Sequence, residues 1–176
     1  MFDFSTLITD RTSSDLQSLR DLLGKPVSEW TEAEKAEFNL ARSKGAYNYT
    51  DLNRVTACMN DLNEVLMGLG YETGYHGIII HPNGAEPTLW CEEDVPTLTQ
   101  MQRYLYNVEA LRGALELPED TAQVPADMVG LTLTEANNIE EILQIIYNYL
   151  TALQKIFLRS GMAWAVSGGP GFYFVN

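Results

Sequence analysis

The chain has 176 residues, of which 45% are hydrophobic, so it is long enough to bury the core of one globular domain. It carries 24 acidic residues against 11 lysines and arginines, for a net charge of −13. Because so acidic a surface is repelled by phosphate backbones and by anionic lipid, we expect no nucleic-acid partner and no membrane partner.

Two short helices are predicted in the first third of the chain. Thr12 is a suitable cap for the first, which carries leucines at helical spacing and ends at Gly24. Thr31 and Glu34 form a capping box, in which each side chain can accept a hydrogen bond from the other residue's backbone N–H. This box opens the second helix, which we expect to end near Gly45.

Three longer helices are predicted after Thr50, after Pro96 and from about Thr134 to Arg159. Each carries apolar residues at alternating spacings of three and four, which is typical of a narrow seam packed against other helices. The seams consist of Leu52, Val55, Met59, Leu62, Leu66 and Leu69; of Met101, Tyr104, Val108, Leu111 and Leu115; and of Ile139, Ile142, Ile146, Tyr149, Leu153 and Ile156. The third helix has further apolar residues beside its seam, so we expect it to be the central and most buried one.

Short β-branched and aromatic runs predict two β-hairpins, the first over residues 78–91 and the second over residues 163–175. A lone hairpin is marginally stable, so the second must pack on the domain, pair with the first or meet another chain. The predicted fold is therefore mainly α. We expect a single domain over residues 1–176, in which four or five helices form a bundle-like body at about 12–160. One or two small β-hairpins complete it, the last at about 161–176.

Thr50 and Thr134 each open a helix with the same pattern: threonine, an acidic residue, an apolar or small residue, then asparagine. We expect both threonines to be N-caps. Ordinary capping chemistry accounts for most of the pattern, with a duplicated helix-pair unit as the alternative. Capping does not account for the asparagines, because asparagine is unfavourable inside a helix. We therefore expect Asn53 and Asn137 to act as structural pins, each bonded to the backbone of a neighbouring loop.

No group of residues predicts a catalytic, cofactor-binding or metal site. His76 and His81 lie five residues apart around an expected strand and would tend to face opposite sides, whereas metal ligands must converge. The sequence has no nucleophile elbow and no phosphate-binding loop. Cys58 is expected to be a buried thiol, and a disulfide with Cys91 is left open. We therefore expect a protein that is not an enzyme and binds no cofactor.

Aromatic residues are the most suggestive feature for binding. Tyr47 and Tyr49 precede the helix that follows Thr50, and Trp90 lies in the first expected hairpin. Exposed aromatic residues favour contacts with proteins or sugars; the alternative is that they cover the edge of the core with their polar atoms in water. A second set of candidate contact residues lies in the last expected hairpin: Trp164, Phe172, Tyr173 and Phe174.

Several strings of residues carry a family resemblance. They are Ile8–Thr12, Trp30–Glu34, Lys44–Val55, Val95–Thr97, Tyr104–Val108 and Leu131–Glu140. Together they resemble a family of prophage-encoded structural proteins from Gram-positive gut bacteria, which are associated with tail or baseplate genes. The resemblance covers most of residues 8–150, and it supplies no catalytic residue to carry over to this chain.

The resemblance implies a non-enzymatic phage particle component of the tail or baseplate type. We expect it to act through protein–protein contacts with other phage structural proteins or with further copies of itself. The alternative is a carbohydrate or host-surface binding module that uses Tyr47, Tyr49 and Trp90. The first residues show no basic and apolar signal-peptide pattern, so we expect synthesis in the bacterial cytoplasm and a final location in the virion.

Overall fold

The structure is a computed structural model, and it describes residues 2–39, 43–78 and 89–159. The described residues form α-helices and short 3₁₀ turns, and they contain no β-strand. In chain order, the elements are η1 (Phe4–Thr6), α1 (Ser13–Leu23), η2 (Val27–Glu29), α2 (Glu32–Asn39), α3 (Tyr49–Gly68), α4 (Leu98–Gly113) and α5 (Leu133–Arg159). The prediction of a mainly helical chain is therefore confirmed.

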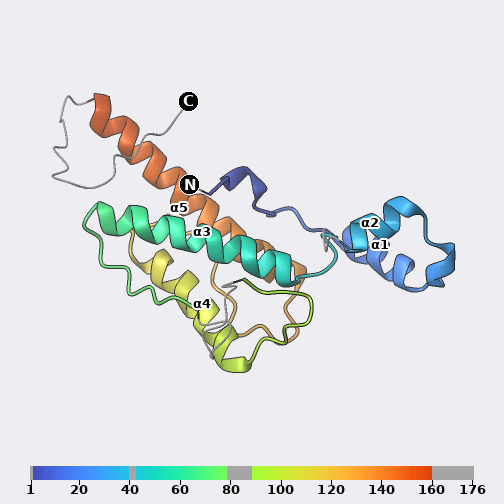
Figure 1. The fold of residues 1–176 in the computed structure, drawn as a ribbon. Coiled ribbons are helices and arrows are strands. Elements are labelled where there is room, and N and C mark those ends of the chain that lie inside the picture. The colour runs from blue at the N-terminus through green and yellow to red at the C-terminus, as the bar shows by residue number, and fades with distance from the viewer. Residues whose placement is uncertain (1, 40–42, 79–88, 160–176) are drawn as a thin grey trace.

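Helices α3, α4 and α5 pack against one another and enclose the core (Figure 1). Its fully buried side chains include Val55, Met59, Leu62 and Leu66 of α3, Tyr104, Val108 and Leu111 of α4, and Ile139, Ile142, Leu143 and Ile146 of α5. The three predicted seams thus meet in one core. The seam of α5 is wrong at Tyr149 and Ile156, which are exposed. The last turns of α5, which include Ile156, extend past the ends of its neighbours (Figure 1), whereas at Tyr149 the buried position is taken by the adjacent Leu150.

The predicted β-hairpins are not supported. Residues 79–88 and 160–176 lie outside the described part of the chain, so most of both expected hairpins does too. Where the flanks of the first one are described, helix side chains pair with the backbone instead of a second strand. Asn107 of α4 bonds the backbone N–H and C=O of His76, and Asn53 of α3 does the same for Trp90. Each asparagine offers the donor and the acceptor that a neighbouring strand would supply.

The N-caps of two helices lie two residues before the predicted ones. Asn48, not Thr50, caps α3: its side-chain oxygen accepts from the backbone N–H of Thr50, and the Asp51 carboxylate accepts from the N–H of Asn48. Thr132, not Thr134, caps α5 through a reciprocal pair of hydrogen bonds with Glu135. In both cases the residue three places after the true cap is an acid that can close a capping box. Three places after Thr50 and Thr134 stand the asparagines Asn53 and Asn137, whose amides bond the backbone of Trp90 and of Arg11.

Helices α1 and α2 form a helical hairpin that stands beside the three-helix body (Figure 1). Both predicted N-terminal caps are confirmed, with capping boxes at Thr12 and at Thr31. The hairpin is closed by Trp30, whose ring meets that of Phe38 edge-on with centroids 5.0 Å apart and whose indole N–H donates to the carbonyl of Lys25. Helix α1 buries none of its leucines fully, so the hairpin keeps apolar surface that the body does not cover.

Candidate functional site: an apolar groove beside the helical hairpin

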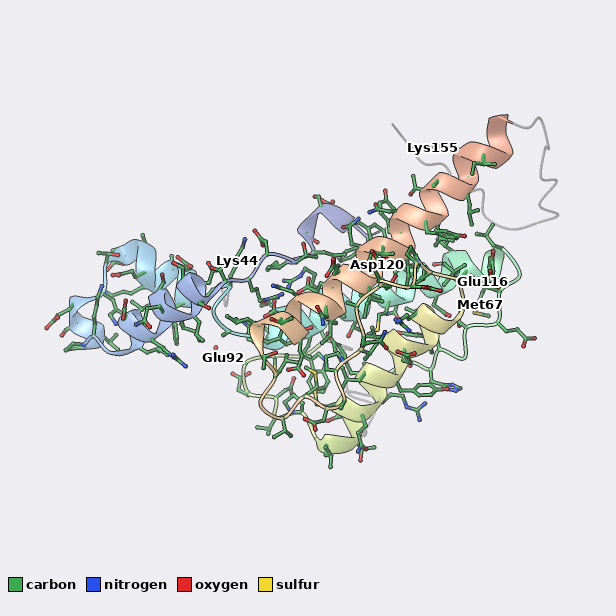
Figure 2. The ribbon with its side chains drawn as sticks, turned by 180° about the vertical axis from the view of Figure 1, so that it is seen from behind. Lys44, Met67, Glu92, Glu116, Asp120 and Lys155 are labelled. Atoms are coloured by element: carbon green, nitrogen blue, oxygen red, sulfur yellow. The ribbon has the colours of Figure 1, made fainter. Side chains whose placement is uncertain are left out.

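An open groove of about 500 Å³ lies between the helical hairpin and the body. Leu19, Leu23 and Phe38 form its hairpin wall, Tyr47, Tyr49, Leu52 and Trp90 form its body wall, and its remaining lining comes from Ser43, Ala46, Asn48, Cys91, Glu92, Asp94 and Pro96. Its position can be followed in Figure 2, where Lys44 and Glu92 mark the end of the body next to the hairpin. We call this feature the groove.

The groove brings together the first set of aromatic residues proposed from the sequence. Tyr47, Tyr49 and Trp90 all lie on its body wall, although 40 residues lie between Tyr49 and Trp90 along the chain. The second set, Trp164, Phe172, Tyr173 and Phe174, lies outside the described residues. The groove also includes residues that the sequence analysis did not single out for binding, above all Leu23 and Phe38. These two side chains are 56% and 40% exposed, respectively, which leaves the hairpin wall open to a partner.

A buried network of charged side chains supports the body wall. Arg11 comes from the segment before α1, Asp51 and Arg54 from the first turns of α3, and Glu140 from α5. One guanidinium nitrogen of Arg11 lies 2.9 Å from an oxygen of Asp51 and 2.6 Å from one of Glu140. Arg54 contacts the same two carboxylates. The two positive and two negative charges cancel, as burial of ionised groups requires.

Glu140 is the centre of this network, and its side chain is fully buried. Besides the two arginines, it accepts a hydrogen bond from the backbone N–H of Ile8 at 2.7 Å. Burial alone would lower the pKa of the Arg54 guanidinium, but the carboxylates of Glu140 and Asp51 outweigh that effect and raise it. The arginine is therefore held in its charged form.

The network fixes the N-terminal segment, which leads directly into the helical hairpin. Asn137 of α5 bonds the backbone N–H and C=O of Arg11, at 2.9 and 3.0 Å. This is the pairing with a neighbouring backbone that the sequence analysis expected of Asn137. Further toward the N-terminus, the ring of Phe4 stacks on that of Tyr147 with centroids 3.9 Å apart. The hairpin thus starts from a segment held against α5 by charge, amide and aromatic contacts.

Tyr47 links the network to the groove. The Arg11 guanidinium lies over its ring, 5.2 Å from the centroid, and its hydroxyl is 2.5 Å from that of Tyr104. Burial, reinforced by the nearby Glu140 carboxylate, raises the pKa of the Tyr47 phenol. The pKa of Tyr104 is raised for the same main reason, with Tyr47 adding to it. Both phenols therefore stay protonated, and Tyr47 presents ring rather than charge to the groove.

Asn53 holds the other part of the body wall. Its amide accepts from the backbone N–H of Trp90 and donates to the carbonyl of Trp90, both at 2.8 Å. Trp90 is only 3% exposed, so these backbone groups have little access to water. The asparagine therefore anchors the loop that carries Trp90 and Cys91 to α3, which is the role of a structural pin.

Both cysteines are free thiols, so the disulfide that the sequence left open does not form. Cys58 is buried in the core, and burial raises the pKa of its thiol. Cys91 lies on the groove, where hydrogen bonding to Asp94 and Glu93 raises the pKa of its thiol. A protonated thiol is a poor nucleophile, so Cys91 is not activated for catalysis, although an added oxidant can still couple it to another thiol.

At Gly45, the chain that leads into α3 passes close to α1 of the hairpin. A methyl group at this position would lie 2.5 Å from the carbonyl oxygen of Asp15 and 2.9 Å from Cβ of Leu19. We expect Gly45→Ala to lower the free energy of unfolding by about 1–3 kcal/mol, because overpacking forces the backbone to shift. Chemical denaturation measures this loss, and limited proteolysis within residues 13–39 shows whether the hairpin has moved away from the body.

Gly113→Ala is the matched control for this change. A methyl group on Gly113, at the end of α4, would meet no atom within 4 Å. Alanine favours helix over glycine by up to about 1 kcal/mol, so this variant should be as stable as the parent or more so. Equal stability of the two variants would show that the hairpin does not depend on the close approach at Gly45.

Sequence reasoning missed the charged network, although one signal for it is present. Glu140 stands four residues after buried Ala136 and three before buried Leu143, so it lies on the apolar face of its helix. A carboxylate in such a stripe requires a buried partner. The sequence alone does not say which arginine that partner is, because Arg11 is 129 positions away.

No metal site or membrane span is found in the part of the chain that the structure describes. Within residues 2–39, 43–78 and 89–159, no three metal-ligating side chains converge, and none of the helices combines the length and hydrophobicity that a bilayer span requires. His76 instead stacks on Tyr106. No family model, curated protein or solved structure is significantly similar to this chain.

Proposed function

We propose that this chain is a non-enzymatic component of a phage particle, of the tail or baseplate type, and that it binds other protein chains through the groove. The observation that carries the proposal is the open hairpin wall of the groove. Leu23 and Phe38 remain substantially exposed beside a body wall that contains buried Trp90 and partly buried Tyr47 and Tyr49. Binding of a protein partner that covers large exposed apolar side chains in a groove is favourable, because it removes their apolar surface from water. The phage assignment itself rests on the sequence resemblance.

The chemistry of the groove favours binding over catalysis. Its tyrosine hydroxyl at Tyr47 is bonded to another phenol, and its thiol at Cys91 is held protonated by neighbouring carboxylates. These groups are in their less reactive forms, whereas a catalytic site shifts pKa values toward reactivity. The apolar side chains that make up most of the two walls instead provide contact area and a shape that a partner can fit.

The carbohydrate alternative has weaker support. Sugar binding by stacking needs an accessible aromatic face. Trp90 is almost fully buried, and the ring of Tyr47 is covered on one side by Arg11. Tyr49 is only partly buried, and one partly exposed tyrosine is a small platform. A glycan array on the purified chain tests this alternative directly, and we expect no specific signal.

The proposal is tested on particles released by induction of the prophage in the bacterium that encodes the chain. Quantitative mass spectrometry of purified particles should find the chain together with tail proteins. Replacing Leu23 and Phe38 by Gln should lower the amount of chain per particle by about tenfold or more, since a few buried apolar anchors dominate such interfaces. Met67→Gln is the control, because Met67 is 62% exposed and lies on the opposite end of α3 (Figure 2).

Absence of the unaltered chain from purified particles would contradict the phage proposal. Normal incorporation of the Leu23→Gln, Phe38→Gln variant would instead contradict the role given to the groove. Circular dichroism of both variants confirms that the helical fold is retained, so that a loss of incorporation reports on binding.

A further inference from the structure

We propose that residues 160–176 of one copy of this chain occupy the groove of a second copy. This inference rests on the proposed binding role of the groove and names its occupant. It predicts a head-to-tail contact between identical chains, in which one end of each copy meets the other end of the next.

The chemistry of the two surfaces matches. Residues 160–176 contain no Lys, Arg, Asp or Glu, although the chain as a whole carries a net charge of −13. They do contain the large apolar side chains Trp164, Phe172, Tyr173 and Phe174. An uncharged aromatic segment can approach an acidic copy without repulsion, and it can fill an apolar groove without leaving a buried charge unpaired.

The positions of the two surfaces place them at opposite ends of the body. Near the start of α5, Glu140 contacts Arg54 of α3, and the groove is lined by Tyr49 and Leu52 from the same turns of α3. From Glu140 to Arg159 the helix rises by about 28 Å, at 1.5 Å per residue. Residues 160–176 therefore follow α5 where it extends past its neighbours, at the end remote from the hairpin (Figure 1).

This arrangement favours a second copy over the same copy as the occupant. To reach the groove of its own copy, the segment would have to run back along the length of α5. About eight of its residues, fully extended at about 3.5 Å each, would be needed to cover that distance. A second copy placed end to end can receive the whole segment, including Trp164. Such a contact joins two different surfaces, so repetition gives a ring or a filament rather than a closed pair, which suits a repeating particle component.

Disulfide trapping tests this proposal, because Cys91 already lines the groove. One version of the chain keeps Cys91, and the other carries Cys91→Ser together with Phe174→Cys. After mixing and mild oxidation, we expect a covalent pair of the two versions on a non-reducing gel, and no such pair from either version alone. The control replaces Phe174→Cys by Val27→Cys, at an exposed position of the hairpin that an end-to-end contact keeps away from the other copy's Cys91, and should give no covalent pair.

Light scattering provides the second measurement. Deletion of residues 160–176 and the Leu23→Gln, Phe38→Gln variant should each weaken self-association by about tenfold or more, as loss of apolar anchors does. Added salt should strengthen association of the unaltered chain, because it screens the repulsion between acidic copies. A monomeric unaltered chain, or unchanged association in either variant, would overturn the proposal. So would a disulfide that forms only within one chain when Cys91 and Phe174→Cys are combined.

The particle experiment separates this inference from the proposed function. If the chain without residues 160–176 still enters particles and the groove variant does not, the groove binds another protein and only the inference fails. If self-association depends on the groove but the chain is absent from particles, the phage proposal fails and the inference stands.

Discussion

Replacing Glu140 by Gln should lower the free energy of unfolding by about 3–5 kcal/mol, which is the usual cost of removing one partner from a buried ion pair. The substitution keeps the size of the side chain and changes its charge and donors. The carboxylate of Glu140 faces N–H groups of Ile8, Arg11 and Arg54 at both of its oxygens. The NH₂ group of a glutamine would therefore point at donors in either orientation, and the two arginines would share only Asp51. Urea denaturation followed by circular dichroism measures the loss.

A second substitution distinguishes lost charge balance from lost packing. Arg11→Met alone should also be strongly destabilising, whereas the pair Arg11→Met with Glu140→Gln leaves one arginine and one aspartate and restores neutrality. We therefore expect the double variant to lose less than the sum of the two single losses, with a coupling of at least about 1 kcal/mol. Lys44→Met is the control, since its ion pair with Asp10 is exposed to solvent and should contribute less than about 1 kcal/mol. Additive losses at Arg11 and Glu140 would contradict this description of the network.

The network has a structural consequence beyond stability. Apolar side chains of the same volume would often stabilise a core as well as a buried ion pair does. Charged partners also fix the position of the segments that carry them. The Glu140 carboxylate has its full set of hydrogen bonds only when Ile8 and Arg11 of the N-terminal segment are in place. That segment leads into α1, so the network determines where the hairpin wall of the groove begins. We regard the geometry of the groove as the product of this network.

The spacing of apolar residues predicted the helical body correctly, because each of its helices carries apolar residues at alternating intervals of three and four. The seams of α3, α4 and α5 are read from local spacing, and burial of those seams is what holds the helices together. The error at Tyr149 and Ile156 has a different origin. At Tyr149 the buried position is the adjacent Leu150, so the spacing rule selected the wrong residue. At Ile156 the neighbouring helices no longer cover α5, and a spacing pattern does not show how far those helices extend.

The caps of α3 and α5 were mispredicted, and the first expected hairpin lacks support at its described flank, because asparagine and threonine side chains compete for the same backbone groups. Asn48 and Thr50 are both good N-caps, and only the position of Asp51 relative to each decides between them. Likewise, an extended stretch near Trp90 suggests a strand, yet its backbone is satisfied by Asn53. Such pairings depend on which segments meet in space, which local patterns do not contain.

The strings that carry the family resemblance acquire a physical meaning from the structure. Arg11 belongs to the first of them, Asp51 and Arg54 to Lys44–Val55, and Glu140 to Leu131–Glu140. The complete buried network is therefore drawn from three of these strings. These strings contain the side chains that hold the N-terminal segment, α3 and α5 together.

Asn53→Ala should destabilise the fold almost as much as the loss of the Glu140 charge. It removes two hydrogen bonds and leaves the backbone N–H and C=O of Trp90 without partners in a nearly water-free position. Unsatisfied buried polar groups cost about 1–3 kcal/mol each, so for these two groups we expect a loss of about 2–6 kcal/mol in the free energy of unfolding. In addition, the loop that carries Trp90 should detach from α3. In a Trp30→Phe, Trp164→Phe background, the emission of Trp90 should shift to longer wavelength and become accessible to a quencher such as acrylamide.

Asn148→Ala is the matched control, because Asn148 is an exposed helical asparagine of α5 whose amide contacts only Gln144 among the described hydrogen bonds. Here the substitution should be neutral or slightly stabilising, since alanine has the higher helix propensity. Asn53→Asp separates the two hydrogen bonds: its carboxylate still accepts from the N–H of Trp90 but cannot donate to the carbonyl, so its loss should be intermediate. If Asn53→Ala and Asn148→Ala were equally stable, the extended segment at Trp90 would have to be held by something other than the asparagine bridge. The position of Trp90 in the body wall of the groove would then not be determined by its hydrogen bonds with Asn53.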